Sequence, residues 1–320
     1  MRRAMDPSQF RAEFPVLEHH AYLNAGTDGP APRRAIDAAS ARMRFELENG
    51  RAGHEHFDAI IALMQRRREL LAGLLAPLAA ARDRRAAVIR QAPFAELAGA
   101  VTDRTRLVAT SHVSWVNGQV VDALGLRATG VPVLLDGAQG IGALPVSVGE
   151  LGCDFYAASG QKWLCGADGT GCLYVNRERL DDIEPRWYGY STVVDSAEPL
   201  TSPLQPDARR LDLGLLASSS GAWSLAALEL FEEAGWDWVH ERGTSLSATL
   251  ADMLAERGHE VQPRGRSTLV SWRDDDCEAT SGTLGENGVV VRFLPGRGLV
   301  RASVGAWNDE SDLERLVALL

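Results

Sequence analysis

The sequence contains almost no lysine. Lys162 is the only lysine in 320 residues, and the other 32 basic residues are arginines. With so strong a preference for arginine, we expect Lys162 to do something that a guanidinium cannot. A guanidinium stays protonated at any ordinary pH, whereas an ammonium group can lose its proton. A neutral lysine attacks carbonyl carbons and forms Schiff bases, so Lys162 is predicted to be a nucleophile.

Several other features that the sequence lacks exclude classes of function. The formal net charge is −10, so there is no basic footprint for nucleic acid or for an anionic membrane. No apolar run reaches the length of a membrane span. The first 17 residues lack the apolar core of a signal peptide. The four cysteines form no CxxC pair, which predicts reduced thiols and a cytoplasmic location.

The first half of the chain predicts a sheet covered by helices. Near-continuous apolar runs indicate strands at 106–114, 131–140, 153–160 and 171–176, and helical patterns cover 35–48 and 55–76. Such runs alternating with helices are typical of an α/β domain with a mostly parallel sheet and helices on both faces.

The second half has a different pattern. Residues 185–219 are rich in loops, and helices are expected at 221–234 and 236–257. Short strands follow in "STLVSW", "GVVVRFL" and "GLVRASV", and "NDESDLERLVALL" is predicted to be a helix capped by Asn308 or Asp309. This pattern predicts a smaller α+β domain.

Polar side chains follow three of the predicted strands at the point where each strand ends. They are Ser111 and His112, then Asp136 and Gln139, then Ser159, Gln161 and Lys162. Ligands of open α/β sheets bind at the carboxyl ends of the strands. We therefore expect these side chains to meet in one crevice.

This set of groups suits pyridoxal phosphate (PLP) chemistry. A PLP enzyme needs a lysine, a carboxylate beside the pyridine nitrogen, a planar group over the ring, a phosphate site and an arginine for the substrate carboxylate. Lys162, Asp136 and His112 suit the first three roles. Asp136 could instead cap a helix, and His112 could be a core histidine.

The segment "LLDGAQGIGALPVSVGELGCDFYAASGQKWLCGADGTGCLYV" resembles the core of the class V aminotransferases, the cysteine-desulfurase-like family of fold-type I PLP enzymes. The resemblance extends from "YLNAGTDGPAP" through "RLVATSHVSWVNG" to "GLVRASVGAWNDESDLERLV". It implies the PLP-transferase fold, and members of the family are homodimers with active sites at the interface. "PRWYGYST" and the tryptophan of "HVSWV" look closer to the isopenicillin-N-epimerase-like branch.

The resemblance also implies a role for each matching residue. Lys162 forms the Schiff base, Asp136 pairs with the pyridine nitrogen, and His112 stacks on the ring. The other implied contacts are Gln139 to the ring hydroxyl, Ser159 and Gln161 to the phosphate, Arg301 to the substrate α-carboxylate, and Asn24 and Ala25 to the substrate pocket. No metal is implied.

Two departures from the family pattern shape the predicted function. "VVRFLPGRGLVRAS" has no cysteine where cysteine desulfurases carry their nucleophile shortly before the arginine, so we predict that the chain is not a cysteine desulfurase. The interval 74–101 has no serine or threonine and only one glycine, Gly99, where relatives carry the turn that holds the phosphate. A block near residue 74 is therefore predicted to be deleted, and "DLGLLASSS" at 212–220 departs from the family pattern as well.

These observations predict an aminotransferase, epimerase or C–S/β-lyase that acts at Cα of an amino acid through an external aldimine. The predicted parts are a pocket segment at 1–35, a PLP-binding domain at 36–185 and a small domain at 186–320.

The alternative is a degenerate PLP-fold homodimer that binds the cofactor weakly and has a non-catalytic role. A Rossmann enzyme fits less well, because "GAQGIG" has the spacing GxxGxG, and "HEH" at 54–56 lacks a third metal ligand.

Overall fold

The computed structural model describes residues 15, 33–50, 88–166, 169–189, 191–212, 227–229 and 231–320. The chain divides into two units, residues 1–75 and 76–320. The main described element of the first unit is helix α2 (Arg33–Asn49), close to the helix predicted at 35–48. It ends at Gly50, whose φ of 76° suits a glycine at the end of a helix.

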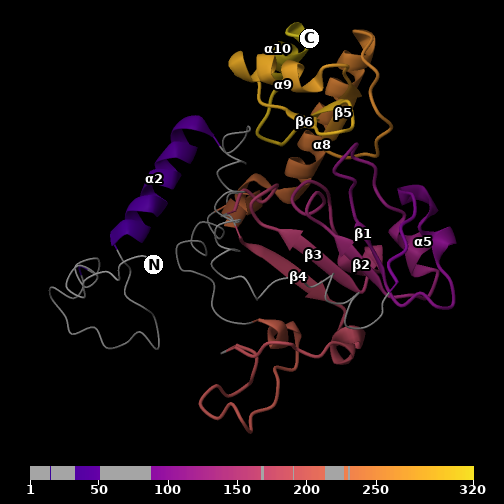
Figure 1. Ribbon diagram of the computed structural model, residues 1–320, viewed down its shortest axis with the longest axis vertical. Helices are drawn as coiled ribbons and strands as arrows, with labels where there is room; N and C mark the ends of the chain where they lie inside the picture. Colours follow the sequence, from indigo (N-terminus) through magenta and orange to yellow (C-terminus); the bar gives the residue numbers. More distant parts are fainter. Residues whose placement is uncertain are drawn as a thin grey trace, which may run out of the picture. The chain divides into compact units, whose positions relative to one another are not determined.

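The second unit contains a four-stranded sheet (Figure 1). Its strands are β1 (Val108–Ser111), β2 (Val133–Asp136), β3 (Phe155–Ser159) and β4 (Gly171–Val175), in that order across the sheet. The first three strands run parallel, and β4 pairs antiparallel with β3. The predicted α/β fold class is confirmed, with a mixed sheet in which each strand lies inside its predicted range.

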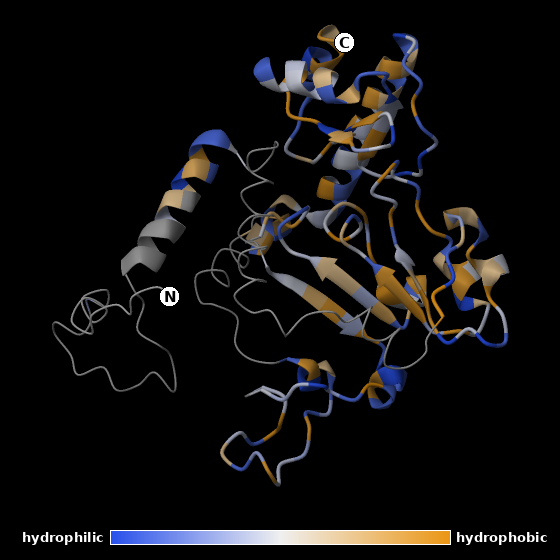
Figure 2. Cartoon of the chain, viewed as in Figure 1, coloured by the Kyte–Doolittle hydropathy of each residue, from blue (hydrophilic) through white to orange (hydrophobic). Residues whose placement is uncertain are grey.

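The core of this sheet explains the apolar runs. Leu135 and Tyr156 are buried together with Leu126 of the short helix α5 (Ala123–Arg127). Figure 2 shows β1 and β2 mostly in apolar colours, as expected for strands with buried faces. Helix α6 (Val148–Leu151) precedes β3, and short 3-10 helices lie at Phe94–Glu96, Ala98–Ala100, Arg177–Asp182 and Ala208–Leu211.

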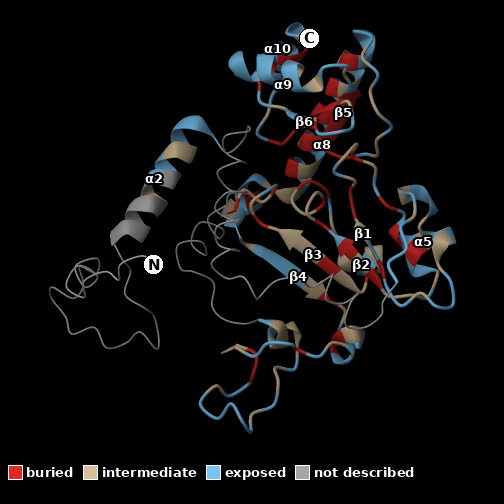
Figure 3. Ribbon diagram, viewed as in Figure 1, coloured by how far each residue is buried: buried red, intermediate tan, exposed pale blue. Residues whose placement is uncertain are grey.

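A three-stranded antiparallel sheet forms the C-terminal part. Its order is β5 (Leu269–Arg273), β7 (Leu299–Ser303) and β6 (Arg292–Leu294). It packs with helices α8 (Trp236–Glu256), α9 (Cys277–Glu286) and α10 (Glu310–Ala318). Figure 3 shows buried residues gathered around β5. This is the α+β pattern predicted for the second half.

Two details of this part go beyond the prediction. Of the two proposed caps of the last helix, the structure selects Asp309, whose side chain accepts hydrogen bonds from the backbone of Ser311 and Asp312. Helix α9 was not predicted, because its sequence "CEATSGTLGE" is rich in threonine and glycine and carries a weak apolar pattern. Within the described ranges, no helix is long and apolar enough to cross a membrane.

Candidate active site

The carboxyl ends of three neighbouring strands bring the predicted groups together. Ser111 of β1 lies opposite Asp136 of β2, and Asp136 lies opposite Ala157 of β3. The backbone N–H of His112 donates to the Asp136 carbonyl oxygen over 2.8 Å. The parallel register therefore places His112, Asp136 and the end of β3 side by side, as the sequence predicted.

His112 is held in one orientation by a residue that sequence reasoning missed. Its Nδ1 lies 3.0 Å from the Tyr156 hydroxyl, and the two rings meet edge to face. His112 is only 3% exposed, and burial lowers its pKa, so the ring is neutral at pH 7. A Cβ at Gly140 would lie 2.5 Å from both Nδ1 of His112 and the Tyr156 hydroxyl, so this position needs glycine. Nothing in "CDFYAASG" marks Tyr156 as a site residue.

Lys162 lies in a tight turn that follows β3. Cys165 donates its backbone N–H to the Lys162 carbonyl oxygen over 3.1 Å, and Gly166 donates to Gly160 over 2.9 Å. Cys165 adopts a left-handed conformation with φ of 51°, which is uncommon outside glycine. Trp163 is buried beside Lys162 and packs against Trp307 with ring centroids 6.1 Å apart. The hydrogen bonds of the turn and the buried Trp163 thus fix the backbone at Lys162, while Lys162 itself is exposed.

The electrostatic surroundings of Lys162 favour its neutral form. Partial desolvation by the surrounding protein is the largest influence and lowers the pKa of Lys162. The carboxylate of Asp136 raises this pKa, while the guanidinium groups of Arg301 and Arg292 lower it. Both sheets therefore contribute charges that act on Lys162, and the net result is a more easily deprotonated amine.

Arg301 reaches this cluster from β7 of the small sheet. Its side chain is buried, with 8% of the residue exposed, and burial lowers its pKa to about 10, with a smaller contribution from Arg292. One guanidinium nitrogen, Nη1, donates to the main-chain oxygen of Trp115 over 2.6 Å. Its Nε has no hydrogen-bond partner within the described part of the chain. A buried cationic donor without a partner is a natural place for an anion.

Three further predicted cofactor residues lie in the same region. The Ser159 hydroxyl, at the end of β3, is buried without a hydrogen-bond partner among the described residues, as expected for a group that awaits a ligand. Gln139 accepts a hydrogen bond from the Trp163 indole over 2.9 Å, which ties the turn after β2 to the Lys162 turn. Gln161 is half-buried directly before Lys162. The residues present therefore fit a PLP site.

Several predicted positions lie outside the described residues. They are Asn24, Ala25, "HEH" at 54–56, the part 74–87 of the interval predicted to be shortened, and residues 213–220 of "DLGLLASSS". The described remainder of the interval, 88–101, contains the two 3-10 helices at Phe94–Glu96 and Ala98–Ala100 and no α-helix or strand.

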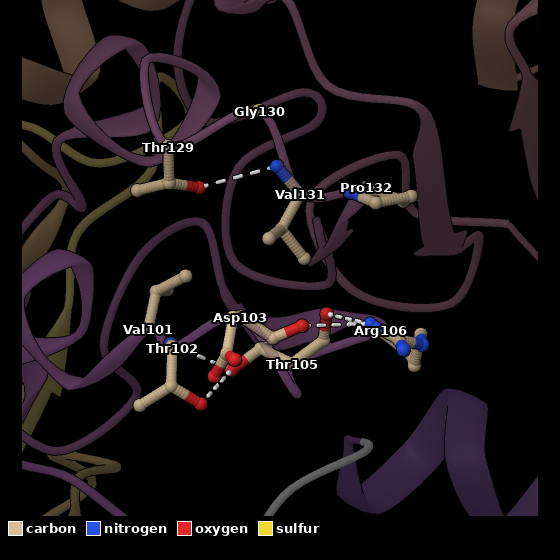
Figure 4. Close-up of a pocket in the computed structure, with 9 residues that line it drawn as sticks. All are labelled: Val101, Thr102, Asp103, Thr105, Arg106, Thr129, Gly130, Val131 and Pro132. Carbon is tan, nitrogen blue, oxygen red and sulfur yellow. Dashed lines mark hydrogen bonds between the residues drawn. The ribbon is translucent and has the colours of Figure 1, made fainter.

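A hollow at the opposite end of the strands carries no comparable chemistry. It is lined by residues that precede β1 and β2: Val101, Thr102, Asp103, Thr105 and Arg106, and Thr129 to Pro132 (Figure 4). Its polar groups pair with one another: Arg106 donates to the carbonyl oxygens of Asp103 and Thr105, and the Thr102 N–H donates to the Thr105 hydroxyl. The cluster of side chains at the carboxyl ends of the strands remains the candidate active site.

Comparison with known proteins identifies the family. The profile of the family "Aminotransferase class-V" matches residues 89–316, so the chain belongs to the class V aminotransferases. The class V aminotransferases are PLP-dependent enzymes. The predicted family, enzyme type and cofactor are therefore confirmed at the level of the family. The proposed epimerase-like branch stays a prediction.

Three similar proteins illustrate the range of the family. The uncharacterized aminotransferase YcbU of Bacillus subtilis is 26% identical over 68% of this chain and 59% of its own length. A probable cysteine desulfurase of Pseudomonas aeruginosa is 33% identical over 69% of this chain and 59% of its own length. The chain thus spans less than two thirds of the curated relatives that it matches.

The third, a solved structure, shows the same fold over nearly the whole chain. It is the complex of the cystine C–S lyase C-DES with its reaction product cysteine persulfide. The match has a TM-score of 0.67 and 24% identity, and it covers 95% of this chain and 98% of the other.

The predicted exclusion of cysteine desulfurase chemistry is wrong. Relatives named as cysteine desulfurases match the chain at 27–33% identity. The exclusion rested on a missing thiol in "VVRFLPGRGLVRAS". One missing nucleophile is a weak criterion, because a C–S bond can also break by elimination, in which sulfur leaves without attack by a protein thiol.

Proposed function

We propose that this chain is a PLP-dependent enzyme that cleaves the C–S bond of cysteine or of its disulfide, cystine. The observation that carries the proposal is the convergence of Asp136, Arg301 and Arg292 on a single lysine whose pKa is lowered. The names of the relatives support the substrate class: several are cysteine desulfurases, and the structural neighbour C-DES is a cystine C–S lyase.

The residues at the strand ends would hold the cofactor. Asp136 would pair with the pyridine nitrogen, His112 would lie over the ring, and Gln139 would donate its amide N–H to the ring hydroxyl. Ser159 and Gln161 would contact the phosphate, and the unpartnered Ser159 hydroxyl supports this role. When bound, PLP supplies the sink for the electron pair left at Cα.

Arg301 would bind the α-carboxylate of the substrate. A guanidinium can hold a carboxylate with two parallel hydrogen bonds, and the buried position of Arg301 strengthens such contacts. Arg292 lies directly opposite Arg301 on β6 and adds a second positive charge. An anionic substrate would relieve the repulsion between these two arginines.

Lys162 would move the proton at Cα. A neutral amine accepts this proton, and the sulfur then leaves Cβ with the bonding electron pair and gains a proton. For cysteine, hydrolysis of the three-carbon product gives pyruvate and ammonia. If the sulfur passes to a thiol and Cβ is protonated instead, the product is alanine.

The proposal is tested by product analysis of the protein loaded with saturating PLP. We expect sulfide or persulfide sulfur from L-cysteine and L-cystine, together with pyruvate or alanine, and little product from L-serine. Arg301→Lys should raise KM for L-cysteine about 10- to 100-fold, because charge-assisted hydrogen bonds are worth about 1.5–3 kcal/mol. Absence of sulfur release from both substrates, with PLP bound, would overturn the proposal.

We also propose that the enzyme works in the cytoplasm. All four cysteines are free, which supports work in a reducing cytoplasm. We propose a homodimer, as the resemblance to the family implies, with an amino acid as the small-molecule partner.

A further inference from the structure

A short turn after β1 links the large sheet to the small one. The backbone N–H of Ser114 donates to the Gln119 carbonyl oxygen, and that of Gly118 donates to Ser114, each over 2.8 Å. Val113 and Val120 pair as an isolated antiparallel bridge at the base of this turn. The segment 114–119 is therefore a closed turn of defined shape, which we call the Trp115 turn.

The Trp115 turn is hydrogen-bonded at three points: to β5, to the segment that precedes β5, and to β7. The Ser271 hydroxyl on β5 donates to the Val116 carbonyl oxygen over 2.5 Å, and the Gly265 N–H donates to the Gly118 carbonyl oxygen over 3.1 Å. The third point is Arg301, whose Nη1 donates to the Trp115 carbonyl oxygen over 2.6 Å. These hydrogen bonds fix the position of the turn relative to β5 and β7.

The Trp115 side chain adds a contact that only an aromatic ring can make. The Arg301 guanidinium carbon lies 6.0 Å from the centre of the Trp115 ring, within the range of a cation–π interaction. Trp115 itself is 41% exposed, whereas Arg301 is only 8% exposed. Arg301 carries a buried charge and faces Arg292 across the strand pair, so it needs such compensation.

We propose that Trp115 is the positioning residue of Arg301: its ring and main-chain oxygen fix the guanidinium so that the Nε edge points to the substrate carboxylate. The proposal rests on the proposed function, in which Arg301 binds that carboxylate. The main-chain oxygen takes Nη1, and Nε is buried without a hydrogen-bond partner in the described structure. The ring fixes the plane of the guanidinium, which sets the direction of a two-pronged contact.

Three variants distinguish the contribution of the Trp115 ring from that of the turn backbone. Trp115→Leu keeps an apolar side chain and the main-chain oxygen but removes the aromatic face, whereas Trp115→Phe restores an aromatic face. Trp238→Leu is the matched control, because Trp238 makes the same kind of contact with Arg242 on α8, 5.8 Å from ring to guanidinium carbon.

The first measurement needs no cofactor. Phenylglyoxal modifies accessible arginines, and mass spectrometry reports the rate at Arg301 relative to the exposed Arg297 in the same protein. We expect the relative rate to rise severalfold in Trp115→Leu and to stay near wild type in Trp115→Phe and Trp238→Leu. An unchanged rate in Trp115→Leu would overturn the proposal.

The second measurement is steady-state kinetics with L-cysteine at saturating PLP. Trp115→Leu should raise KM about 3- to 30-fold with kcat within about twofold, and Trp115→Phe should recover most of the loss. A general structural defect would lower kcat in both variants. A fall in kcat with unchanged KM would contradict a role in binding the carboxylate.

Arg301→Lys distinguishes the two proposals. If it leaves KM for L-cysteine unchanged, another group binds the carboxylate and that part of the proposed function fails, together with the substrate role of Trp115. If Arg301→Lys raises KM but Trp115→Leu does not, only the inference about Trp115 fails.

Discussion

Lys162 shows how the rarity of one residue type can mark a functional side chain. It is the only lysine in a chain with 33 basic residues, and the structure places it where protein atoms and two arginines lower its pKa. A lowered pKa means that the amine loses its proton at a lower pH than an unperturbed lysine does. The neutral fraction available for reaction at pH 7–8 is therefore larger.

Borohydride reduction should attach the cofactor to Lys162. With PLP added, we expect peptide mapping to find a stable pyridoxyl adduct on the peptide containing Lys162, since the N-terminal amine is the only other primary amine in the chain. Lys162→Arg keeps a positive charge but has no nucleophilic amine, so it should not be labelled. Labelling of the N-terminus alone at saturating PLP would show that Lys162 is not the attachment point.

At the scale of elements, the Trp115 turn depends on a glycine. Gly118 has φ of 77°, and a Cβ there would overlap the Ser267 hydroxyl and lie 2.9 Å from the Leu269 carbonyl oxygen. Only a residue without a side chain allows the turn to pack this closely on β5. The contact between the two sheets at Arg301 therefore depends on the backbone of one turn as well as on side chains.

Gly118→Ala should lower the free energy of unfolding by about 2–4 kcal/mol, since overpacking costs about 1–3 kcal/mol and a left-handed alanine about 1 kcal/mol more. Urea denaturation measures this loss. Gly130→Ala is the matched control: its φ is 72°, but a Cβ there meets nothing within 4 Å, so only the conformational cost of about 1 kcal/mol applies. Equal losses in both variants would show that Gly118 is not sterically constrained.

At the scale of the whole molecule, the chain spans only part of the length of the curated relatives that it matches. The P. aeruginosa and B. subtilis relatives are each matched over 59% of their length. The interval 74–101, which we predict to be shortened, falls where the phosphate-binding turn of the family is expected, and its described part, 88–101, offers no α-helix N-terminus. Leu107 beside β1 and Leu173 on β4 are each 47% exposed, so the large sheet carries apolar side chains in contact with solvent.

This arrangement predicts weak binding of the cofactor and low turnover. We expect PLP to be lost on dialysis, because Ser159 and Gln161 would hold the phosphate without the backbone N–H groups of a helix N-terminus, and each charged hydrogen bond to the phosphate would add about 1.5–3 kcal/mol. Absorbance titration of the dialysed protein measures the Kd of PLP. Retention of stoichiometric PLP through dialysis would show that another segment holds the phosphate.

The sequence by itself determined the sheet, the family and the residues at the strand ends. Parallel strands finish at one edge, so His112, Asp136, Ser159 and Lys162 could be grouped from local patterns alone. Sequence reasoning was less successful at α9, where threonine and glycine blur the helical period. It was wrong about cysteine desulfurase chemistry, because it relied on one missing residue.

Only the tertiary structure decided which distant residues complete the site. Arg301 and Trp115 are 186 positions apart, and Tyr156 meets His112 from a different strand. Local sequence patterns report which face of a strand is buried, but they carry no information on which side chains meet across two sheets. The contact between Arg301 and Trp115 depends on the packing of the Trp115 turn against β5 and β7, which forms only when the large and small sheets come together.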